Sequence, residues 1–352
     1  MDCLELQYCI TDEQLDEFLS FRRMLYKGDE SYVCTSEFVL TDTIYKRTDF
    51  ANECMVLPAV VKKNNAIVAE CVFIHNSKLP YLSIAFFEAE KNQDDAVELI
   101  LSEARAVATR CNVKKIVIGH NGHISYGVGI LTTRFDYKNS FDSNYNKDYY
   151  AKYFSHLKKQ GLSTYMQNKR AMEKHLIAGG AYKIRKANMK SFEQEAELMR
   201  ELCDKTIGKT FLYFPTEKGH FYQLMRDLRP FLKDENLLFA EDKDGKTVGF
   251  LFWHPDFNRM LKGGKHYSTL GIALAYIFKS HKIKNAKLNA IGALSPRVTC
   301  ELLNELSKVL GSRFKTLETN FVWDNNLPST FINRRFFGEP HRRYEVYFDE
   351  ID

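Results

Sequence analysis

The amino-acid sequence predicts an α/β fold with mixed sheets, arranged as two domains in tandem. At 352 residues the chain is longer than the range in which a single hydrophobic core keeps growing. The same order of elements can be followed twice along it: strand, helices, hairpin, central strand, helix, parallel strand, helix. We therefore expect a first domain over residues 1–178 and a second over residues 179–352, joined where Gly179 and Gly180 supply flexible backbone.

The first half begins with alternating residues 4–10, which predict a strand, and Thr11 then suits the N-cap of a helix. Further strands are expected at 57–61, 67–74, 81–88 and 113–118, and further helices at 92–108 and 147–160. Because residues 113–118 follow a strand and a crossover helix, they should pair in parallel with residues 81–88. Gly161 is expected to cap the last of these helices.

The second half repeats this order with stronger local signals. Strands are expected at 182–187, 237–241, 246–253, 286–294, 315–323 and 343–348. Helices are expected at 192–203, 217–232 and 267–280, and also from Pro296 and from Pro328. The turn 242–245, which ends in Asp-Gly, predicts a hairpin. Ser295 is placed to cap the helix that starts at Pro296.

Charge and cysteine content exclude several classes of protein. The 50 basic and 45 acidic residues give a formal charge of +5, which is no signature of nucleic-acid binding. The eight cysteines form no CxxC pair and have no histidine at ligand spacing, so no metal site is expected. The sequence shows neither a secretory signal pattern nor an apolar run of about 20 residues. It predicts a cytoplasmic protein with reduced thiols and no membrane span.

The second half resembles the GNAT acyltransferase superfamily. The likeness is carried by the hairpin and strand at 242–250, by 291–294 before a helix, and by 323–326 before another. The whole chain is similar to a bacterial group of paired GNAT-like domains, through residues 21–26, 86–89, 119–136, 149–150 and 343–347. This resemblance implies an N-acyltransferase that uses acetyl-CoA or a longer acyl-CoA as co-substrate, without a metal.

A helix N-terminus is the expected binding place for the diphosphate of such a donor, because its free N–H groups and dipole favour anions. The resemblance places the donor at Leu294, Ser295, Arg297, Val298, Thr299 and Asn325. The segment 294–300 lacks the glycines usual in the superfamily, so the side chains of Arg297 and Thr299 are expected to supply contacts. The counterpart 88–95 carries four carboxylates, which would repel a diphosphate. The donor is therefore expected in the second domain.

Acyl transfer to an amine requires a base for the amine and an acid for the leaving thiolate. Glu88, at the end of a central strand, and His254 and Asp256, after the hairpin, are the candidate bases. The resemblance puts Ile332 where a tyrosine acid is common, so Tyr344 on the last strand is the candidate acid. Each of these residues also has a purely structural interpretation, as a capping acid, a turn or a packed strand residue.

Two functions are consistent with these features. The first is an acyltransferase that moves an acyl group from acyl-CoA, or from an acyl carrier protein, to a small-molecule or lipid-like amine. The second is a catalytically inactive binding protein that keeps the fold and has lost the donor site. No nucleic-acid partner is expected. The first function requires that the helix start at Pro296 is accessible and that the two parallel strands beside it separate.

Overall fold

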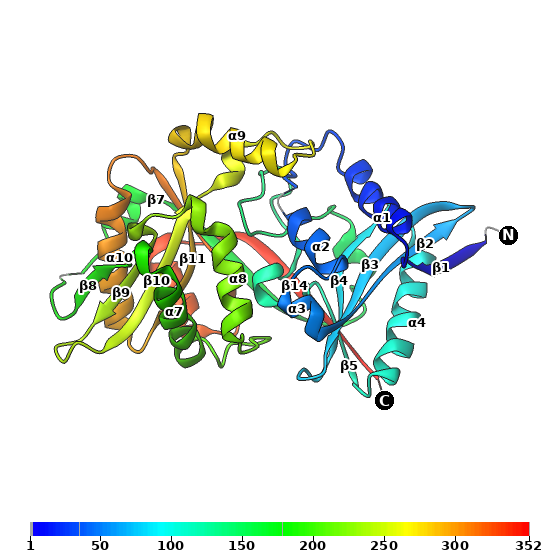
Figure 1. Cartoon of the computed structure of the whole chain (residues 1–352), viewed down its shortest axis with the longest axis horizontal. Coiled ribbons are helices and arrows are strands. Elements are labelled where there is room, and N and C mark those ends of the chain that lie inside the picture. The colour runs from blue at the N-terminus through cyan, green and yellow to red at the C-terminus, as the bar shows by residue number, and fades with distance from the viewer. Residues whose placement is uncertain (1–2, 35, 178, 352) are drawn as a thin grey trace. The chain divides into compact units, whose positions relative to one another are not determined.

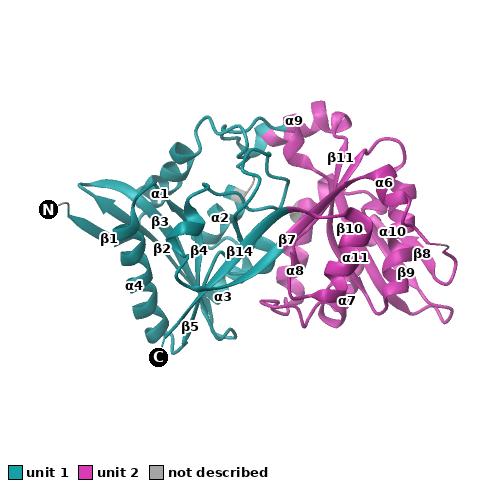
Figure 2. Cartoon of the chain, turned by 180° about the vertical axis from the view of Figure 1, so that it is seen from behind, with its two compact units in different colours: residues 1–162, 261–271, 342–352 teal, residues 163–260, 272–341 magenta. Residues whose placement is uncertain are grey.

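The computed structural model describes residues 3–34, 36–177 and 179–351 (Figure 1). The chain forms two compact units (Figure 2), one of residues 1–162, 261–271 and 342–352, the other of residues 163–260 and 272–341. The division between Leu162 and Ser163 falls inside strand β7 (Lys158–Asn168). Ala178, where the first domain was expected to end, lies outside the described residues.

The first unit contains a sheet in the order β1-β2-β3-β4-β5-β14. Its strands are β1 (Leu4–Tyr8), β2 (Cys54–Lys63), β3 (Ala66–Asn76), β4 (Leu82–Ala89), β5 (Lys115–Ile118) and β14 (Pro340–Glu350), with β6 (Ile130–Leu131) paired to β14. Its helices are α1 (Asp12–Leu25), α2 (Ser36–Ile44), α3 (Asp49–Glu53), α4 (Asp94–Arg110) and α5 (Tyr150–Tyr153). Strands β4 and β5 run parallel, and the other neighbours in this order run antiparallel.

The second unit repeats that topology in the order β8-β9-β10-β11-β12-β7. Its other strands are β8 (Lys183–Lys186), β9 (Leu237–Glu241), β10 (Thr247–Pro255), β11 (Asn285–Ala293), β12 (Thr316–Thr319) and β13 (Val322–Trp323). Its helices are α6 (Lys169–Glu173), α7 (Phe192–Thr206), α8 (Lys218–Leu228), α10 (Pro296–Leu310) and α11 (Leu327–Phe337), and α9 (Thr269–Lys279) starts in the first unit and ends in the second. Here β11 and β12 are the parallel pair. The repeated order of elements is therefore confirmed.

The last strand of each sheet comes from the other half of the chain. Residues 342–350 of β14 belong to the first unit, and residues 163–168 of β7 belong to the second. Strand β14 pairs with β5 at Tyr347↔Ile118, and β7 pairs with β12 at Met166↔Glu318. Each sheet is thus completed by a strand whose pairing partner in that sheet lies far from it in sequence.

Each unit has its own apolar core, formed where helices cover the sheet. In the first unit the core joins α4 to the central strands and includes Val61, Phe73, Ile84, Ile100 and Leu101. In the second, one cluster joins α7 and α8 to β9 and β10 and includes Met199, Leu202, Met225, Phe239 and Phe252.

Local sequence signals explain the helix starts that position the site. The Thr11 hydroxyl accepts a hydrogen bond from the Gln14 N–H at 3.3 Å, and the Gln14 side chain accepts one from the Thr11 N–H at 3.1 Å, which makes a capping box. Ser295 caps α10, and Pro296 occupies its first position, as expected. Helix α10 packs closely on β10 because Gly249 has no side chain: a Cβ there would lie 2.6 Å from Cγ1 of Val298.

The predicted helix over residues 147–160 is wrong. Only α5 is helical in this region, and Gly161 lies inside strand β7 instead of capping a helix. The spacing of Tyr149, Tyr150 and Tyr153 resembles a helical stripe, but the following residues gain backbone hydrogen bonds by pairing with a strand, and that tertiary pairing overrides the local pattern.

Candidate functional site

The two parallel strands of the second unit separate halfway along β11. Strands β11 and β12 pair only as far as Leu288↔Thr319. Beyond that point β11 stays paired with β10, up to Gly249↔Ala293, whereas the chain after β12 pairs again as β13 with β7. Residues 290–293 of β11 are therefore not paired with β12. The separation that acyl transfer requires is present.

This part of β11 is partly open, and it leads directly to the start of α10. Ala290, Ile291 and Ala293 are half-buried. Leu294 is 54% exposed, and the Arg297 side chain is 60% exposed. The start of α10 is therefore open to solvent. The Ser295 hydroxyl caps one of its N–H groups, and the helix dipole still favours an anion there.

The predicted donor residues gather at this helix start, apart from Asn325. The Ser295 hydroxyl accepts a hydrogen bond from the Val298 N–H at 3.4 Å, and the Val298 side chain is buried against β10. Thr299 is half-buried, and its N–H donates to the Ser295 carbonyl at 3.3 Å. Arg297 lies 3.5 Å from Glu301, one turn along. Asn325 is exposed in the turn between β13 and α11.

The equivalent position in the first unit is filled by the protein itself. There β4 and β5 pair only to Ile84↔Ile118, yet all of β4 is buried. The Asn121 side chain accepts the N–H of Phe86 at 2.8 Å, and the Tyr150 hydroxyl accepts that of Ala89 at 2.8 Å. These side chains occupy the hydrogen-bonding positions that a donor's pantetheine arm would use, which favours the second unit as the donor site.

Glu88, a candidate base, belongs to this filled region. It is 2% exposed, and its Oε2 accepts hydrogen bonds from the Tyr26 and Tyr150 hydroxyls, both at 2.6 Å. Arg22 lies 3.0 Å from its Oε1, and Glu70 lies 3.6 Å from Arg22. Burial raises the pKa of Glu88 above its usual value and raises that of Glu70 further. Glu88 is thus surrounded by partners from its own unit.

The backbone near Glu88 is strained at Phe86, whose φ is 51°, in the left-handed region that bulky residues rarely adopt. Its N–H is bound by Asn121, and its carbonyl accepts a hydrogen bond from Arg22 at 2.7 Å. A register shift between Glu70 and Val72 marks a bulge on the same pair of strands. Arg22 and Asn121 together hold the strand in this conformation.

Tyr344, the candidate acid, lies on β14 in the first unit opposite Leu131. It is 3% exposed and packs on Gly129, where an added Cβ would lie 2.5 Å from that of Tyr344. Gly129 also has a φ of 89°, so glycine is required there for two reasons.

His254 lies in a row of titratable residues that crosses three strands of the second unit. It faces Lys287 on β11, and Lys287 faces Glu318 on β12. Residues paired in register point to the same face of a sheet. This row lies one position before the strands separate, and its three side chains are at most 4% exposed. Lys287 Nζ lies 3.6 Å from Glu318 Oε1, to which Thr164 donates at 3.5 Å.

The corresponding row of the first unit carries no charge: it consists of Ile74, Ser83 and Val117. The charged row is therefore particular to the unit whose strand edge is open. Sequence reasoning missed Lys287 and Glu318. The available signal was a charged residue within each of two predicted strands, but only the register of those strands places the two residues side by side.

Asp256 lies just beyond this row and stabilises a turn. Its carboxylate accepts from Arg259 Nε at 2.7 Å, and its N–H donates to the Asn285 carbonyl at 2.9 Å. It is 2% exposed. These contacts match the structural interpretation of the Pro255-Asp256 turn.

One cluster within the described residues has the donor types of a metal site. The ligand atoms of Cys34, Glu37 and His266 lie within 4.8 Å of one another in the first unit. Arg23 Nε donates to Glu37 Oε1 at 2.7 Å, so the carboxylate is already neutralised by a cation. Burial raises the pKa of the Cys34 thiol, which disfavours the thiolate that a metal needs. Cys34 and Glu37 are three residues apart, but His266 is far from both in sequence, so no local spacing indicates the cluster.

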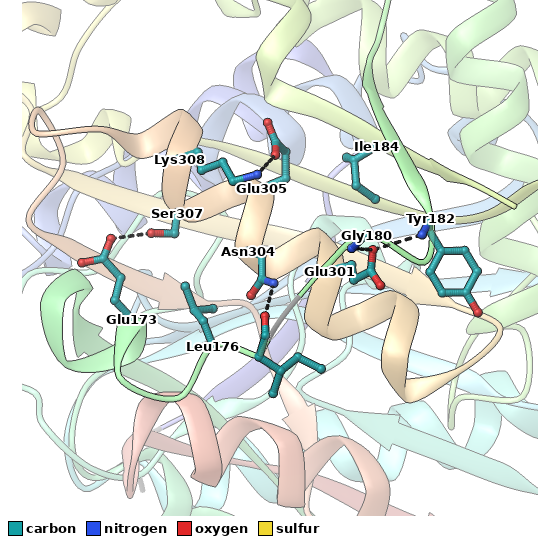
Figure 3. Close-up of a pocket in the computed structure, with 12 residues that line it drawn as sticks. Glu173, Leu176, Gly180, Tyr182, Ile184, Glu301, Asn304, Glu305, Ser307 and Lys308 are labelled. Atoms are coloured by element: carbon teal, nitrogen blue, oxygen red, sulfur yellow. Dashed lines mark hydrogen bonds and ion pairs between the residues drawn. The ribbon is translucent and has the colours of Figure 1, made fainter. Parts of the chain in front are cut away.

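A pocket of about 770 Å³ lies elsewhere on the second unit, beside α10 (Figure 3). Its floor includes Glu301, whose carboxylate accepts the N–H groups of Gly180, Ala181 and Tyr182 at 3.2, 3.1 and 3.2 Å. Burial alone would raise the pKa of Glu301, but these N–H groups and Arg297 lower it below its usual value. Glu301 therefore holds residues 180–182 on α10, although Gly179 and Gly180 were expected to supply flexible backbone.

Replacing Glu301 with alanine is expected to destabilise the protein by about 2–3 kcal/mol at pH 7, because three N–H groups lose a charged acceptor. Since the folded pKa is lowered, this stabilisation is present above the unfolded value of about 4.3 and disappears as pH falls below it. Urea unfolding at pH 7 and at pH 3.5 measures both effects. Glu305→Ala, which removes only an ion pair with the exposed Lys308, is the control. An equal loss in both variants would contradict the role of Glu301.

Structural comparison finds the same fold over nearly the whole chain. A tandem GNAT protein from the clavulanic acid biosynthesis pathway matches with a TM-score of 0.57 and 11% identity, over 99% of this chain and 98% of that one. A GCN5-related N-acetyltransferase from Sphaerobacter thermophilus matches with a TM-score of 0.56 and 11% identity, over 99% and 95%. A probable N-acyltransferase from Enterococcus faecalis V583 matches with a TM-score of 0.54 and 7% identity, over 100% and 73%.

These likenesses show the fold: the chain is folded like a tandem GNAT protein, as the sequence resemblance implied. At the level of sequence, no family model and no curated protein matches the chain. Among the described residues, none of the helices combines the length and the apolar composition needed to cross a bilayer.

Proposed function

We propose that the second unit binds an acyl-CoA donor and transfers its acyl group to an amine. The observation that carries this proposal is the open edge of β11 beyond Leu288, which leads directly to the start of α10. The donor's diphosphate would bind the N–H groups at this helix start, with Arg297 adding a cation. The pantetheine arm would lie along residues 289–293 as an added strand does.

The charged row lies where the thioester end of such an arm would reach the last paired residues of β11. Glu318, or His254 on the other side of Lys287, would take a proton from the attacking amine. The amine nitrogen then forms a bond to the acyl carbon, and the carbon–sulfur bond breaks to release the CoA thiolate. Lys287, between the two and 3.6 Å from Glu318, would supply positive charge near the developing negative charge.

A second candidate function, binding without catalysis, is favoured by two observations. The row residues are almost completely buried and contact one another, as a structural ion pair would. The donor segment 294–299 also lacks glycine and contains Pro296, which removes one N–H. Both candidates use the second unit, and they differ in whether a thioester is consumed.

Thermal unfolding in the presence of donors tests the proposal. A ligand at about 100 times its dissociation constant adds about 2.7 kcal/mol, which for units of this size raises the melting temperature by about 5–10 °C. Acetyl-CoA, a long-chain acyl-CoA, free CoA and an acyl carrier protein are the ligands to compare. Arg297→Glu is expected to reduce the shift. Lys91→Glu, at the exposed start of the corresponding helix in the first unit, should leave it unchanged.

The outcomes separate the candidates. A shift with acyl-CoA together with thiol release in the presence of a panel of primary amines supports the transferase. A shift without thiol release favours the binding protein. If none of the four ligands changes the melting temperature, donor binding by the second unit is ruled out.

A further inference from the structure

The segment from Phe257 to Cys300 carries a charge unlike that of the rest of the chain. These residues include no aspartate or glutamate, whereas the chain as a whole has 45 acidic and 50 basic residues. The basic residues of the segment are Arg259, Lys262, Lys265, Lys279, Lys282, Lys284, Lys287 and Arg297. Of these, Lys287 is buried, and Arg259 and Arg297 pair with acidic residues that flank the segment. An acid-free, basic stretch of this length is typical of a surface that meets an anionic partner.

Helix α9, shown in yellow in Figure 1, lies in the middle of this segment and exposes an apolar stripe. The exposed residues are Leu270, Leu274, Ile277 and Phe278, with exposed fractions of 70%, 46%, 66% and 67%. Their spacing of four, three and one residues places them on one face of the helix. These four account for four of the ten large apolar side chains that are exposed in the described residues. Single exposed apolar residues are ordinary, but a contiguous stripe marks an interaction surface.

The other face of α9 holds it on the second unit. Ala275 is buried, and the Tyr276 ring lies 4.7 Å from that of Phe231 in an edge-to-face contact. Tyr276 also packs edge-on against Phe257 at 5.9 Å. The helix is therefore anchored by one side, which leaves the stripe directed away from its own core.

Cations follow the stripe at the end of α9. Three lysines at this end of the helix are exposed: Lys279, Lys282 and Lys284. Within the described residues, none of them forms an ion pair. Arg313 donates to the Ser280 carbonyl at 2.7 Å, which brings a further positive charge to this corner. Exposed apolar residues bordered by lysines match a bilayer that carries negative headgroups.

We propose that α9 and the lysines that follow it bind the surface of an anionic phospholipid bilayer. The helix would lie in the plane of the headgroups, with its stripe inserted among the acyl chains and the lysines at the phosphates. With 11 residues it is about 16 Å long, so it lies on the membrane and does not cross it. A second copy of the chain fits less well, because it would bring another set of lysines to the same place. The proposal does not depend on acyl transfer.

Vesicle binding by the full chain tests this inference. At low salt the protein is expected to sediment with vesicles of phosphatidylcholine that contain about 30% phosphatidylglycerol. Its binding should be weaker by about tenfold or more with vesicles of phosphatidylcholine alone, and also when the salt concentration is high. Phe278→Trp supplies a reporter of insertion, because the two native tryptophans are each 2% exposed and will respond little. Its emission should shift to shorter wavelength when anionic vesicles are added.

Matched variants locate the contact. Ile277→Gln with Phe278→Gln, and separately Lys282→Glu with Lys284→Glu, should each weaken binding by about tenfold or more. The controls remove exposed groups elsewhere: Ile10→Gln with Met24→Gln, and Lys91→Glu with Lys243→Glu. Absence of binding to anionic vesicles, or an equal loss in the control variants, overturns the proposal. So does a monomer–dimer equilibrium that the stripe variant abolishes, since the stripe would then join two copies.

Discussion

Replacing Arg22 with methionine is expected to destabilise the first unit by about 3–5 kcal/mol at pH 7. Arg22 is completely buried between Glu70 and Glu88, and it is the cation that both carboxylates face. Removing one member of a buried charged group leaves the others uncompensated, which costs far more than the group as a whole contributes. Urea unfolding of Arg22→Met against the unchanged protein measures the loss.

The pH dependence of that variant distinguishes lost charge compensation from lost packing. Burial already raises the pKa of Glu70 and Glu88. A carboxyl group whose pKa is raised by folding makes its full contribution to the free energy of unfolding below its unfolded pKa of about 4.3. That contribution is lost as pH rises through the pKa of the folded state. Without Arg22 both values rise further, so the deficit should shrink between pH 7 and pH 5. A deficit that stays constant over this range would assign it to packing.

Neutralising the carboxylates supplies the control. The triple variant Arg22→Met, Glu70→Gln and Glu88→Gln should recover most of the lost stability, because no uncompensated charge remains. Glu70→Gln alone should be neutral or stabilising at pH 7, since the carboxylate oxygens of Glu70 accept no hydrogen bond within the described residues. A strong destabilisation by Glu70→Gln would contradict this account of the cluster.

The two units share one topology but differ in the side chains that lie where the parallel strands separate. In the first, Asn121 and Tyr150 bind the edge that the parted strands leave, and a buried charged cluster lies behind them. In the second, that edge is half-exposed, and a row of three titratable side chains lies at its base. The difference resides in a few side chains, since strand order and direction are the same.

Much of this arrangement could be predicted because its signals are local. The caps at Thr11 and Ser295, the Asp-Gly hairpin and the apolar stripe of α10 fix where elements begin and end. The expectation that a donor binds at the start of α10 rests on these signals together with a resemblance, and it stays a prediction. The four carboxylates at residues 88–95 are the reason for expecting the donor in the second domain.

The rest depends on pairing between distant segments. Strand β7 was missed because its partners lie more than 140 residues away, and Tyr150 and Tyr153 favoured a longer helix. Lys287 and Glu318 were missed because only the register of β11 with β12 places them side by side. The contacts of Glu88 could not be predicted for the same reason, since Arg22 and Tyr26 reach it from another part of the chain.

Replacing Glu318 with glutamine is expected to lower acyl transfer by about 10²- to 10⁴-fold while donor binding is retained. The amide keeps the size of the carboxylate and its contact with Thr164, but it cannot accept the proton that the attacking amine must lose. Thiol release from acyl-CoA with a primary amine measures the rate, and the donor-induced rise in melting temperature measures binding. This prediction rests on the proposed function of the second unit.

Two further variants decide what a lower rate means. Glu305→Gln, at a half-buried carboxylate on α10 whose recorded partner is Lys308, should leave the rate unchanged. Replacing Lys287 with methionine together with Glu318→Leu removes the buried pair without leaving a lone charge, so it should keep the fold and lose the rate. If Glu318→Gln transfers acyl groups at the normal rate and His254→Gln does not, the base is His254. If both retain full activity, the row is a structural feature, and the proton must leave by a route outside these three strands.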